Sequence, residues 1–280
     1  MFIKSGTIGI IADDLTGAND TALQFHLRGC NTQILFDYNS LPESILSTHA
    51  WAISTETRNL PADKAVSIVK NASKNLIENL NTEYFYKKID STLRGNIAQE
   101  TLALLNALGW DAAVIIPAFP SEGRVTVGGY HLLKGVPIDR TEMARDPNAP
   151  VRESHIPTLL AQQAENPEII GHIELKTVTK GAGPILMDLQ QLVKDGKKLI
   201  VIDAVSTTDI EQVVLAIEKS SYNILPCGSA GLAQSLGNAW LPEMKHQHIA
   251  KKLPDLPILL VSGSATSLTK TQIEKVIESD

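Results

Sequence analysis

The segment 86–96, with the sequence YKKIDSTLRGN, carries the densest group of charged and hydroxylated side chains in the chain. It combines three cations, one carboxylate, two hydroxyls, a glycine and an amide, contributed by Lys87, Lys88, Asp90, Ser91, Thr92, Arg94, Gly95 and Asn96. Such a loop before a helix N-terminus suits a small anion, because the side-chain charges act together with free backbone N–H groups and the helix dipole. A solvated surface loop is the alternative that the composition leaves open.

A pair of adjacent carboxylates, Asp13 and Asp14, follows the apolar run 7–12. Two carboxylates at the end of a strand suit a cation, a hydroxyl group or a proton transfer. The alternative is that one of them caps the helix that follows. We expect one to cap and the other to act on a ligand, and the spacing does not assign which.

Two arginines follow further strand candidates. Arg58 comes after the apolar run 50–54, and Arg124 comes after the run 112–116. An arginine in this position can clamp a carboxylate or a phosphate through two parallel hydrogen bonds. For Arg58, a surface ion pair with Glu56 explains the local sequence equally well.

Two weaker signals lie further along the chain. The small-residue turn GSAG at 228–231 lets the backbone approach a ligand, although packing against a neighbouring element explains it at least as well. His155 is the most interesting histidine, but a lone histidine is more often structural than catalytic.

Alternating strands and helices must position these side chains. Strands are predicted at 7–12, 32–36, 50–54, 83–86, 112–116, 169–175, 199–203 and 223–227. Helices are predicted at 18–28, 61–80, 97–108, 159–164, 186–194, 208–219 and 228–240, and the stretch 125–157 suggests turns or a hairpin. This alternation is typical of a parallel sheet with one ligand-binding edge. We therefore predict an α/β fold with a three-layer, parallel-sheet N-terminal domain.

Composition narrows the class of protein. The 280 residues are 43% hydrophobic and 20% charged, as in globular proteins, and the net charge of -6 argues against a nucleic-acid binder. Cys30 and Cys227 lie in no metal-ligand spacing and suggest no disulfide framework. The N-terminus lacks a signal-peptide pattern, and no apolar run reaches the roughly 18 residues of a membrane span. We expect a cytoplasmic enzyme or binding protein without a membrane partner.

The C-terminal part of the sequence begins a second unit. After a domain at 1–245, the basic, proline-bearing stretch 246–257 is predicted to be a linker. A strand at 258–261 and a helix at 269–277 enclose Ser262, Gly263 and Ser264, a turn that suits a nucleotide phosphate. One strand and one helix do not make a domain, so 258–280 either packs onto the first domain or begins an incomplete α/β nucleotide-binding domain.

Together these segments resemble the four-carbon acid sugar kinases, a family that includes D-threonate, D-erythronate and 3-oxo-tetronate kinases. The matching stretches are 12–18, 54–58, 86–96, 117–124, 146–157, 228–233 and 261–264 with Thr269 and Gln272. The form KKIDSTLR is closer to the threonate kinases than to the oxo-tetronate kinases. Members of the family continue well beyond Asp280, so we expect the ATP-binding domain to be barely begun.

The resemblance implies transfer of the γ-phosphoryl group of ATP, with Mg²⁺, to the terminal hydroxyl of a four-carbon sugar acid. Arg58 and Lys88 would hold the substrate carboxylate, and Lys88 or Arg94 would neutralise charge on the transferred group. Asp13, Ser91 and Thr92 would contact the substrate. Asp90, or else Asp14, would accept the hydroxyl proton, and Ser262, Gly263 and Ser264 would touch the nucleotide.

Two other functions remain open at this point. One is a truncated, non-catalytic acid-sugar-binding protein that cannot hold ATP. The other is a metal-dependent sugar-acid aldolase or dehydratase that uses Asp13 and Asp14. A homodimer is possible in each case.

Overall fold

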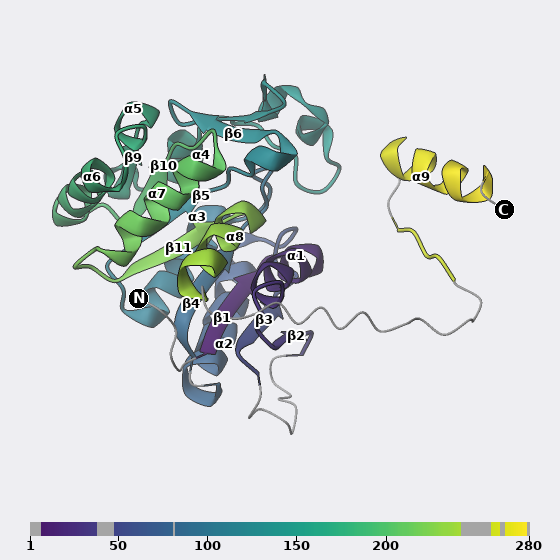
Figure 1. Cartoon of the computed structure of the whole chain (residues 1–280), viewed down its shortest axis with the longest axis horizontal. Helices are drawn as coiled ribbons and strands as arrows, with labels where there is room; N and C mark the ends of the chain where they lie inside the picture. Colours follow the sequence, from purple (N-terminus) through teal and green to yellow (C-terminus); the bar gives the residue numbers. More distant parts are fainter. Residues whose placement is uncertain (1–6, 38–47, 81, 242–258, 264–266, 279–280) are drawn as a thin grey trace. The chain divides into compact units, whose positions relative to one another are not determined.

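The computed structural model describes residues 7–37, 48–80, 82–241, 259–263 and 267–278. The chain divides into two compact units, Met1–His246 and Gln247–Asp280, which are described separately (Figure 1).

The first unit is built on an eight-stranded sheet in the order β2-β3-β1-β4-β11-β5-β10-β9, and all of its strand pairs are parallel. The strands are β1 (Thr7–Ala12), β2 (Thr32–Leu35), β3 (Ala50–Ser54), β4 (Thr82–Lys88), β5 (Ala112–Ile116), β9 (Ile170–Ile173), β10 (Leu199–Ile202) and β11 (Ile224–Gly228). The central strands β3, β5, β10 and β11 are buried along their whole length, as expected for a parallel sheet covered on both faces.

Helices cover both faces of this sheet (Figure 1). They are α1 (Leu15–His26), α2 (Ala62–Asn79), α3 (Ile97–Leu108), α4 (Ile156–Ala164), α5 (Leu175–Val178), α6 (Ala182–Lys194), α7 (Thr207–Glu218) and α8 (Ala230–Trp240). One apolar core joins the sheet to α1, α6, α7 and α8, and the other joins it to α2, α3 and α4. The predicted three-layer α/β architecture is therefore confirmed. None of the helices in the described ranges is both long and apolar enough to cross a bilayer.

Strand β4 extends two residues further at its C-terminal end than predicted from the sequence. The prediction stopped the strand at residue 86, before the two lysines, whereas β4 continues to Lys88. Lys88 pairs with Ala12 of β1 and with Gly228 of β11, in the middle of the sheet. Charged residues are rare in a buried strand, and this one tolerates them because each ammonium group has polar neighbours at the sheet edge.

A small antiparallel sheet follows β5. It consists of β6 (Arg124–Val127), β7 (Tyr130–Leu133) and β8 (Val136–Pro137), flanked by the 3₁₀ turns η1 (Pro120–Glu122), η2 (Ile138–Arg140) and η3 (Glu142–Arg145). A fourth turn, η4 (Pro167–Ile169), precedes β9. Asp203, at the end of β10, accepts hydrogen bonds from the N–H groups of Gly128 and Gly129 at 2.6 and 2.9 Å. These bonds hold the β6–β7 turn over the carboxyl edge of the large sheet.

The described part of the second unit is the segment 259–263 and the helix α9 (Ser267–Glu278). The predicted strand at 258–261 is not seen: Leu259–Val261 form no strand and are solvent-exposed, while Ile258 lies outside the described residues. A strand needs a neighbour to complete its hydrogen bonds, and this unit supplies none in its described part.

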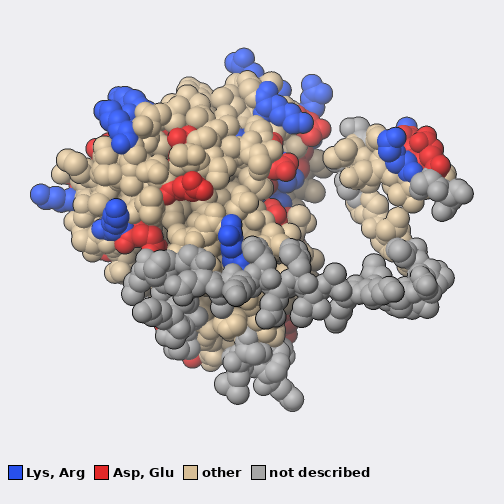
Figure 2. All heavy atoms as spheres, in the orientation of Figure 1, with Lys and Arg blue, Asp and Glu red and all other residues tan. Residues whose placement is uncertain are grey.

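Charged side chains on the face of the first unit shown in Figure 2 are interspersed, with Lys and Arg lying among Asp and Glu. This mixed surface contrasts with the carboxyl edge of the sheet, where charges are gathered and buried.

Candidate active site at the carboxyl edge of the sheet

The strand order places β1 between β3 and β4, so the side chains that follow these three strands meet at one point. Arg58 is at the centre of this group, and its side chain is 11% exposed. Its Nε and Nη2 donate to the two carboxylate oxygens of Asp13 at 2.8 and 2.9 Å, and its Nη1 donates to Asp14 Oδ2 at 2.6 Å. The surface pair of Arg58 with Glu56 is thereby excluded, because Glu56 instead accepts from Ser54.

The expectation that one of Asp13 and Asp14 caps the helix and the other is left for a ligand holds only for the cap. Asp14 caps α1 through a hydrogen bond from Gly17 N–H to its Oδ1 at 2.8 Å, and it also binds Arg58. Asp13 makes no cap and accepts both parallel bonds from Arg58. Burial lowers the pKa of Arg58, but these hydrogen bonds and carboxylate charges outweigh it and raise the pKa above its usual value.

The adjacent lysines of β4 point to opposite faces of the sheet, as successive strand residues must. Lys87 Nζ forms an ion pair with Glu100 of α3 at 3.0 Å, and both side chains are 1% exposed. Lys88 reaches the other face, where its Nζ donates to the carbonyl of Ile89 at 2.9 Å. The two ammonium groups therefore have different partners: a carboxylate for Lys87 and a single carbonyl for Lys88.

Lys88 is a buried cation without an ion pair in the described part of the chain. Burial lowers its pKa, and the neighbouring charges of Asp13, Asp90 and Asp14 compensate only in part. Gly17 gives the ammonium its room, because a Cβ there would lie 2.9 Å from Lys88 Nζ and 2.6 Å from Asp14 Oδ1. A buried charge with unfilled donors is costly, so it indicates a binding role.

Asp90 anchors the loop between β4 and α3. Its Oδ2 accepts from Arg94 Nε at 2.6 Å and from Thr92 Oγ1 at 2.5 Å. Arg94 also binds Asp146 through Nη1 at 3.0 Å. Burial raises the pKa of Asp90, but the hydrogen bond from Arg94 and the charge of Arg58 outweigh it and hold the pKa well below its usual range.

Left-handed backbone precedes both arginines of the site. Glu56 has φ +51° two residues before Arg58, and Leu93 has φ +66° immediately before Arg94. Residues other than glycine adopt this conformation at some energetic cost, and such strain concentrates at functional sites. Ser91 belongs to the same loop, and its carbonyl accepts from Nε2 of the buried His131 at 2.9 Å.

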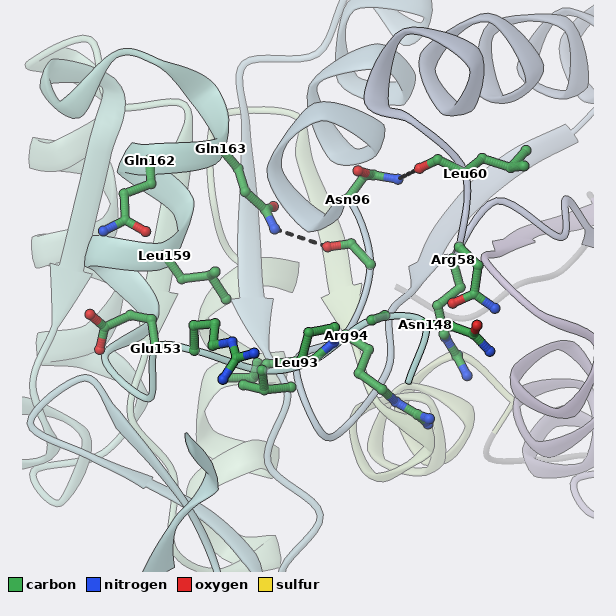
Figure 3. A pocket seen from close by; sticks show the side chains of 16 residues that line it. Arg58, Leu60, Leu93, Arg94, Asn96, Asn148, Glu153, Leu159, Gln162 and Gln163 are labelled. Atoms are coloured by element: carbon green, nitrogen blue, oxygen red, sulfur yellow. Dashed lines mark hydrogen bonds between the residues drawn. The ribbon is translucent and has the colours of Figure 1, made fainter. Parts of the chain in front are cut away.

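A cavity of about 360 Å³ opens beside this cluster (Figure 3). Its walls come from the segments after β3 and β4, from the loop 148–153 and from α4. Gln163 fixes two of these walls, since its Nε2 donates to Gly95 O at 2.9 Å and its Oε1 accepts from Ala98 N–H at 2.8 Å. Asn96 Nδ2 likewise donates to Leu60 O at 2.9 Å.

The polar side chains that line this cavity were not among the site residues predicted from the sequence. They include Asn59, Asn148, Arg152, Glu153, Gln162 and Gln163. Isolated Asn and Gln residues carry no spacing signal, and 148–163 is far from 58–96 in sequence. Two signs pointed to this region: the rigid, proline-rich loop at 146–150, since loops often border binding sites, and the family resemblance of the stretch 146–157.

Other predicted residues have structural partners or lie elsewhere. His155 binds Thr158 Oγ1 through Nδ1 at 2.7 Å and packs on Tyr130. Gly228 serves packing, because a Cβ there would lie 2.3 Å from Ile116 O. Ser262 and Gly263 are exposed in the second unit, and Ser264 lies outside the described residues.

Asp20 of α1 is a further acidic residue that the sequence analysis did not single out. Burial raises the pKa of Asp20, and the charges of Lys88 and Arg124 counteract this only in part. Asp20 is therefore a carboxyl group near Lys88 whose ionised form is less favoured than that of a free aspartate.

The described residues contain no group of three His, Cys, Asp or Glu side chains placed to bind a metal ion. Asp13 and Asp14 do not provide one, because their oxygens are already bound by Arg58 and by Gly17 N–H. A metal that is held by this chain's own side chains alone does not fit this site.

Residues 8–236 match the family described as the sugar-binding N-terminal domain. The chain belongs to this family. Among curated proteins, the chain is 34% identical over 272 residues to the D-erythronate kinase of Heliobacterium modesticaldum, a match that covers 95% of the chain and 59% of the relative. It is also 34% identical over 268 residues to the D-threonate kinase of Salmonella typhimurium, covering 96% of the chain and 60% of the relative. The chain thus spans about three-fifths of the length of these kinases.

Solved structures agree with this assignment. The chain is similar to a DUF1537 protein of Haemophilus influenzae with a TM-score of 0.79 at 29% identity, covering 96% of the chain and 65% of that structure. A DUF1537 domain of Bordetella bronchiseptica, a domain-swapped dimer with bound citrate, gives a TM-score of 0.71 at 34% identity, covering 83% and 56%. The resemblance to the four-carbon acid sugar kinases is confirmed at the level of the family.

Proposed function

We propose that this chain is the substrate-binding part of an ATP-dependent kinase that phosphorylates the terminal hydroxyl of a four-carbon sugar acid such as D-threonate or D-erythronate. The observation that carries the proposal is the match of 95–96% of the chain to kinases for these two acids. The charged cluster at the carboxyl edge supports it, because ligands of parallel α/β sheets bind at that edge.

Lys88 and Arg58 have separate roles in this proposal. Three of the five N–H donors of Arg58 already bind Asp13 and Asp14, so this arginine mainly orders the two carboxylates and keeps two donors for a ligand. Lys88 has the unfilled donors and no carboxylate partner within ion-pair distance in the described residues. Lys88 therefore offers the positive charge for the transferred phosphoryl group.

In the reaction, the terminal hydroxyl oxygen attacks the γ-phosphorus, the bond to the bridging oxygen breaks, and ADP leaves. The hydroxyl proton passes to a carboxylate. The sequence alone ranks Asp90 before Asp14 as this acceptor, and the geometry supports the reverse order. Both carboxylates are hydrogen-bonded, Asp90 by Arg94 and Thr92 and Asp14 by Arg58 and Gly17 N–H. Asp90 is buried and its pKa is held low, whereas the side chain of Asp14 is 21% exposed and so is the more accessible acceptor.

ATP would bind in part through the second unit, whose residues 258–280 we propose as the beginning of a nucleotide-binding domain after a substrate domain at 1–245 and a linker at 246–257. Ser262, Gly263 and Ser264 would touch its phosphates. Mg²⁺ would arrive with those phosphates, since it is often held by one or two carboxylates together with substrate phosphates.

We also propose a cytoplasmic location and a homodimer, the latter because the Bordetella bronchiseptica relative is a domain-swapped dimer. The same relative was solved with bound citrate, which supports a carboxylate as ligand. No nucleic-acid partner is proposed.

The test is a coupled assay of ADP release by the purified chain with ATP, Mg²⁺ and either D-threonate or D-erythronate, run beside equilibrium dialysis of each labelled acid. Turnover supports the kinase. Binding of an acid without turnover or ATP binding favours the non-catalytic binding protein. Metal-dependent consumption of an acid without ATP favours the aldolase or dehydratase.

A further inference from the structure

The polar side chains that line the cavity fall into two sets: those already bound within the protein and those available to a ligand. Arg58 and Arg94 are bound, the first by Asp13 and Asp14 and the second by Asp90 and Asp146. Asn96 and Gln163 are bound as well, because both donate to backbone carbonyls of the walls. These four side chains build the cavity, and most of their donors are already used within the protein.

The available set consists of Asn59, Asn148, Gln162 and Arg152, four exposed residues whose side chains form no hydrogen bond or ion pair with a described residue. Figure 3 shows Asn148 on the side of Arg58 and Arg94, and Gln162 on the opposite side with Glu153. Carboxamides on two sides of a cavity suit a ligand with several hydroxyl groups, since each amide both donates and accepts.

Arg152 is the cation of this set. Its backbone is fixed, because the neighbouring Val151 is buried and its N–H donates to Met143 O at 3.0 Å. Glu153, on the other side of Arg152 in the sequence, turns its Oε1 to the N–H of His155 at 2.7 Å. The guanidinium of Arg152 therefore keeps its five donors for a ligand on a loop of defined position.

Charge decides where an acidic ligand would place its carboxylate. Arg58 and Arg94 each face two carboxylates, so neither group presents a net positive charge to the cavity. Lys88 does not line the cavity. Among the cations that line the cavity, Arg152 is thus the one that can bind an anion without giving up a carboxylate partner in the described residues. Its guanidinium can bind a carboxylate through two parallel hydrogen bonds.

We propose that the cavity is the sugar-acid site and that Arg152 is its specificity-determining residue, holding the substrate carboxylate while Asn59, Asn148 and Gln162 bind the hydroxyls. This inference rests on the proposed function, which supplies the ligand class: a small monocarboxylate with several hydroxyl groups. The volume of about 360 Å³ is within the range of roughly 300–1,000 Å³ of small-molecule sites.

The experiment is calorimetric titration of the whole chain with D-threonate and with D-threonamide, its uncharged analogue. The variants are Arg152→Ala, Arg152→Lys and, as the matched control, Arg145→Ala, an exposed arginine that does not line the cavity. We expect Arg152→Ala to weaken D-threonate binding roughly 10- to 100-fold, the range of a hydrogen bond to a charged group. Arg152→Lys should recover part of this loss, Arg145→Ala should match the wild type, and the wild-type preference for the acid over the amide should disappear in Arg152→Ala.

The outcomes separate the two proposals. If the wild type binds the acid and Arg152→Ala binds it equally well, Arg152 is not the anchor and the proposed function still stands. If Arg152→Ala loses the acid and the amide in parallel, or Arg152→Lys recovers nothing, a charge-reading role is refuted. If the folded wild type, checked by circular dichroism, binds neither D-threonate nor D-erythronate, the proposed function fails and this assignment fails with it.

Discussion

Replacing Lys88 with methionine is expected to stabilise the fold and at the same time to lower turnover. Lys88 is 4% exposed and its ammonium group has one carbonyl partner. Burying this charge therefore lowers the free energy of unfolding of the wild type. Relief of an unsatisfied buried polar group is worth about 1–3 kcal/mol. At about 2–4 °C per kcal/mol for a domain of this size, the midpoint of thermal unfolding should rise by roughly 2–12 °C.

The matched control is Lys87→Met, the same substitution at the preceding residue. It removes the partner of Glu100, whose side chain is 1% exposed, and leaves a buried carboxylate unpaired. Breaking such a pair costs about 3–5 kcal/mol, so this variant should be destabilised. Urea unfolding at pH 7, followed by circular dichroism, measures both variants against the wild type.

The pH dependence gives a second check on Lys88. Its pKa in the folded state is lowered from 10.5, so in the window just below that value the unfolded chain binds more protons than the folded one. The contribution of this group to the free energy of unfolding therefore rises with pH through the window. The advantage of Lys88→Met over the wild type should shrink between pH 7 and pH 10. A variant less stable than the wild type at pH 7, or an advantage that grows with pH, would refute the reasoning.

Three further predictions concern the same site. Gly17→Ala should lower turnover, because the added methyl group displaces Lys88 Nζ and Asp14; the coupled assay of ADP release measures the loss, and unchanged turnover would contradict the assigned packing. Asp14→Asn should lower turnover by roughly 100-fold or more with a smaller change in KM, as expected for a proton acceptor, whereas turnover near wild type would exclude that role. Asp90→Asn should raise KM at least as much as it lowers kcat, because Asp90 anchors Arg94; a pure loss of kcat would restore Asp90 as the acceptor.

Much of this arrangement could be predicted from the order of residue types. Apolar runs alternating with amphipathic segments fixed the parallel sheet, and the parallel direction required the residues after β1, β3 and β4 to share one edge. That is why Asp13, Arg58 and Lys88 meet although they are far apart in sequence. This prediction required the strand order and direction alone, without knowledge of side-chain contacts.

Pairing between side chains was not predictable in the same way. The sequence offered Arg58 as a substrate clamp, whereas in the fold three of its donors are used by Asp13 and Asp14. The sequence does not distinguish the two lysines of β4. In the fold their side chains point to opposite faces of the sheet, so Lys87 forms an ion pair with Glu100, whereas Lys88 lies beside Gly17. Burial and partner choice depend on tertiary packing, which local patterns do not encode.

The cavity was missed for a related reason. Its outer wall comes from the loop 148–153 and from α4, and nothing in the spacing of Asn148, Arg152 or Gln162 ties them to Arg58. The strand expected at 258–261 failed differently, since an apolar run becomes a strand only when a neighbour accepts its hydrogen bonds.

The central claim is that this edge of the sheet binds a four-carbon sugar acid, and calorimetric titration of the wild-type chain with D-threonate and D-erythronate tests it most directly. We predict saturable binding of at least one of the two acids at one site per chain, weakened in Arg152→Ala. Absence of binding of both acids to the folded chain at millimolar concentration would contradict it.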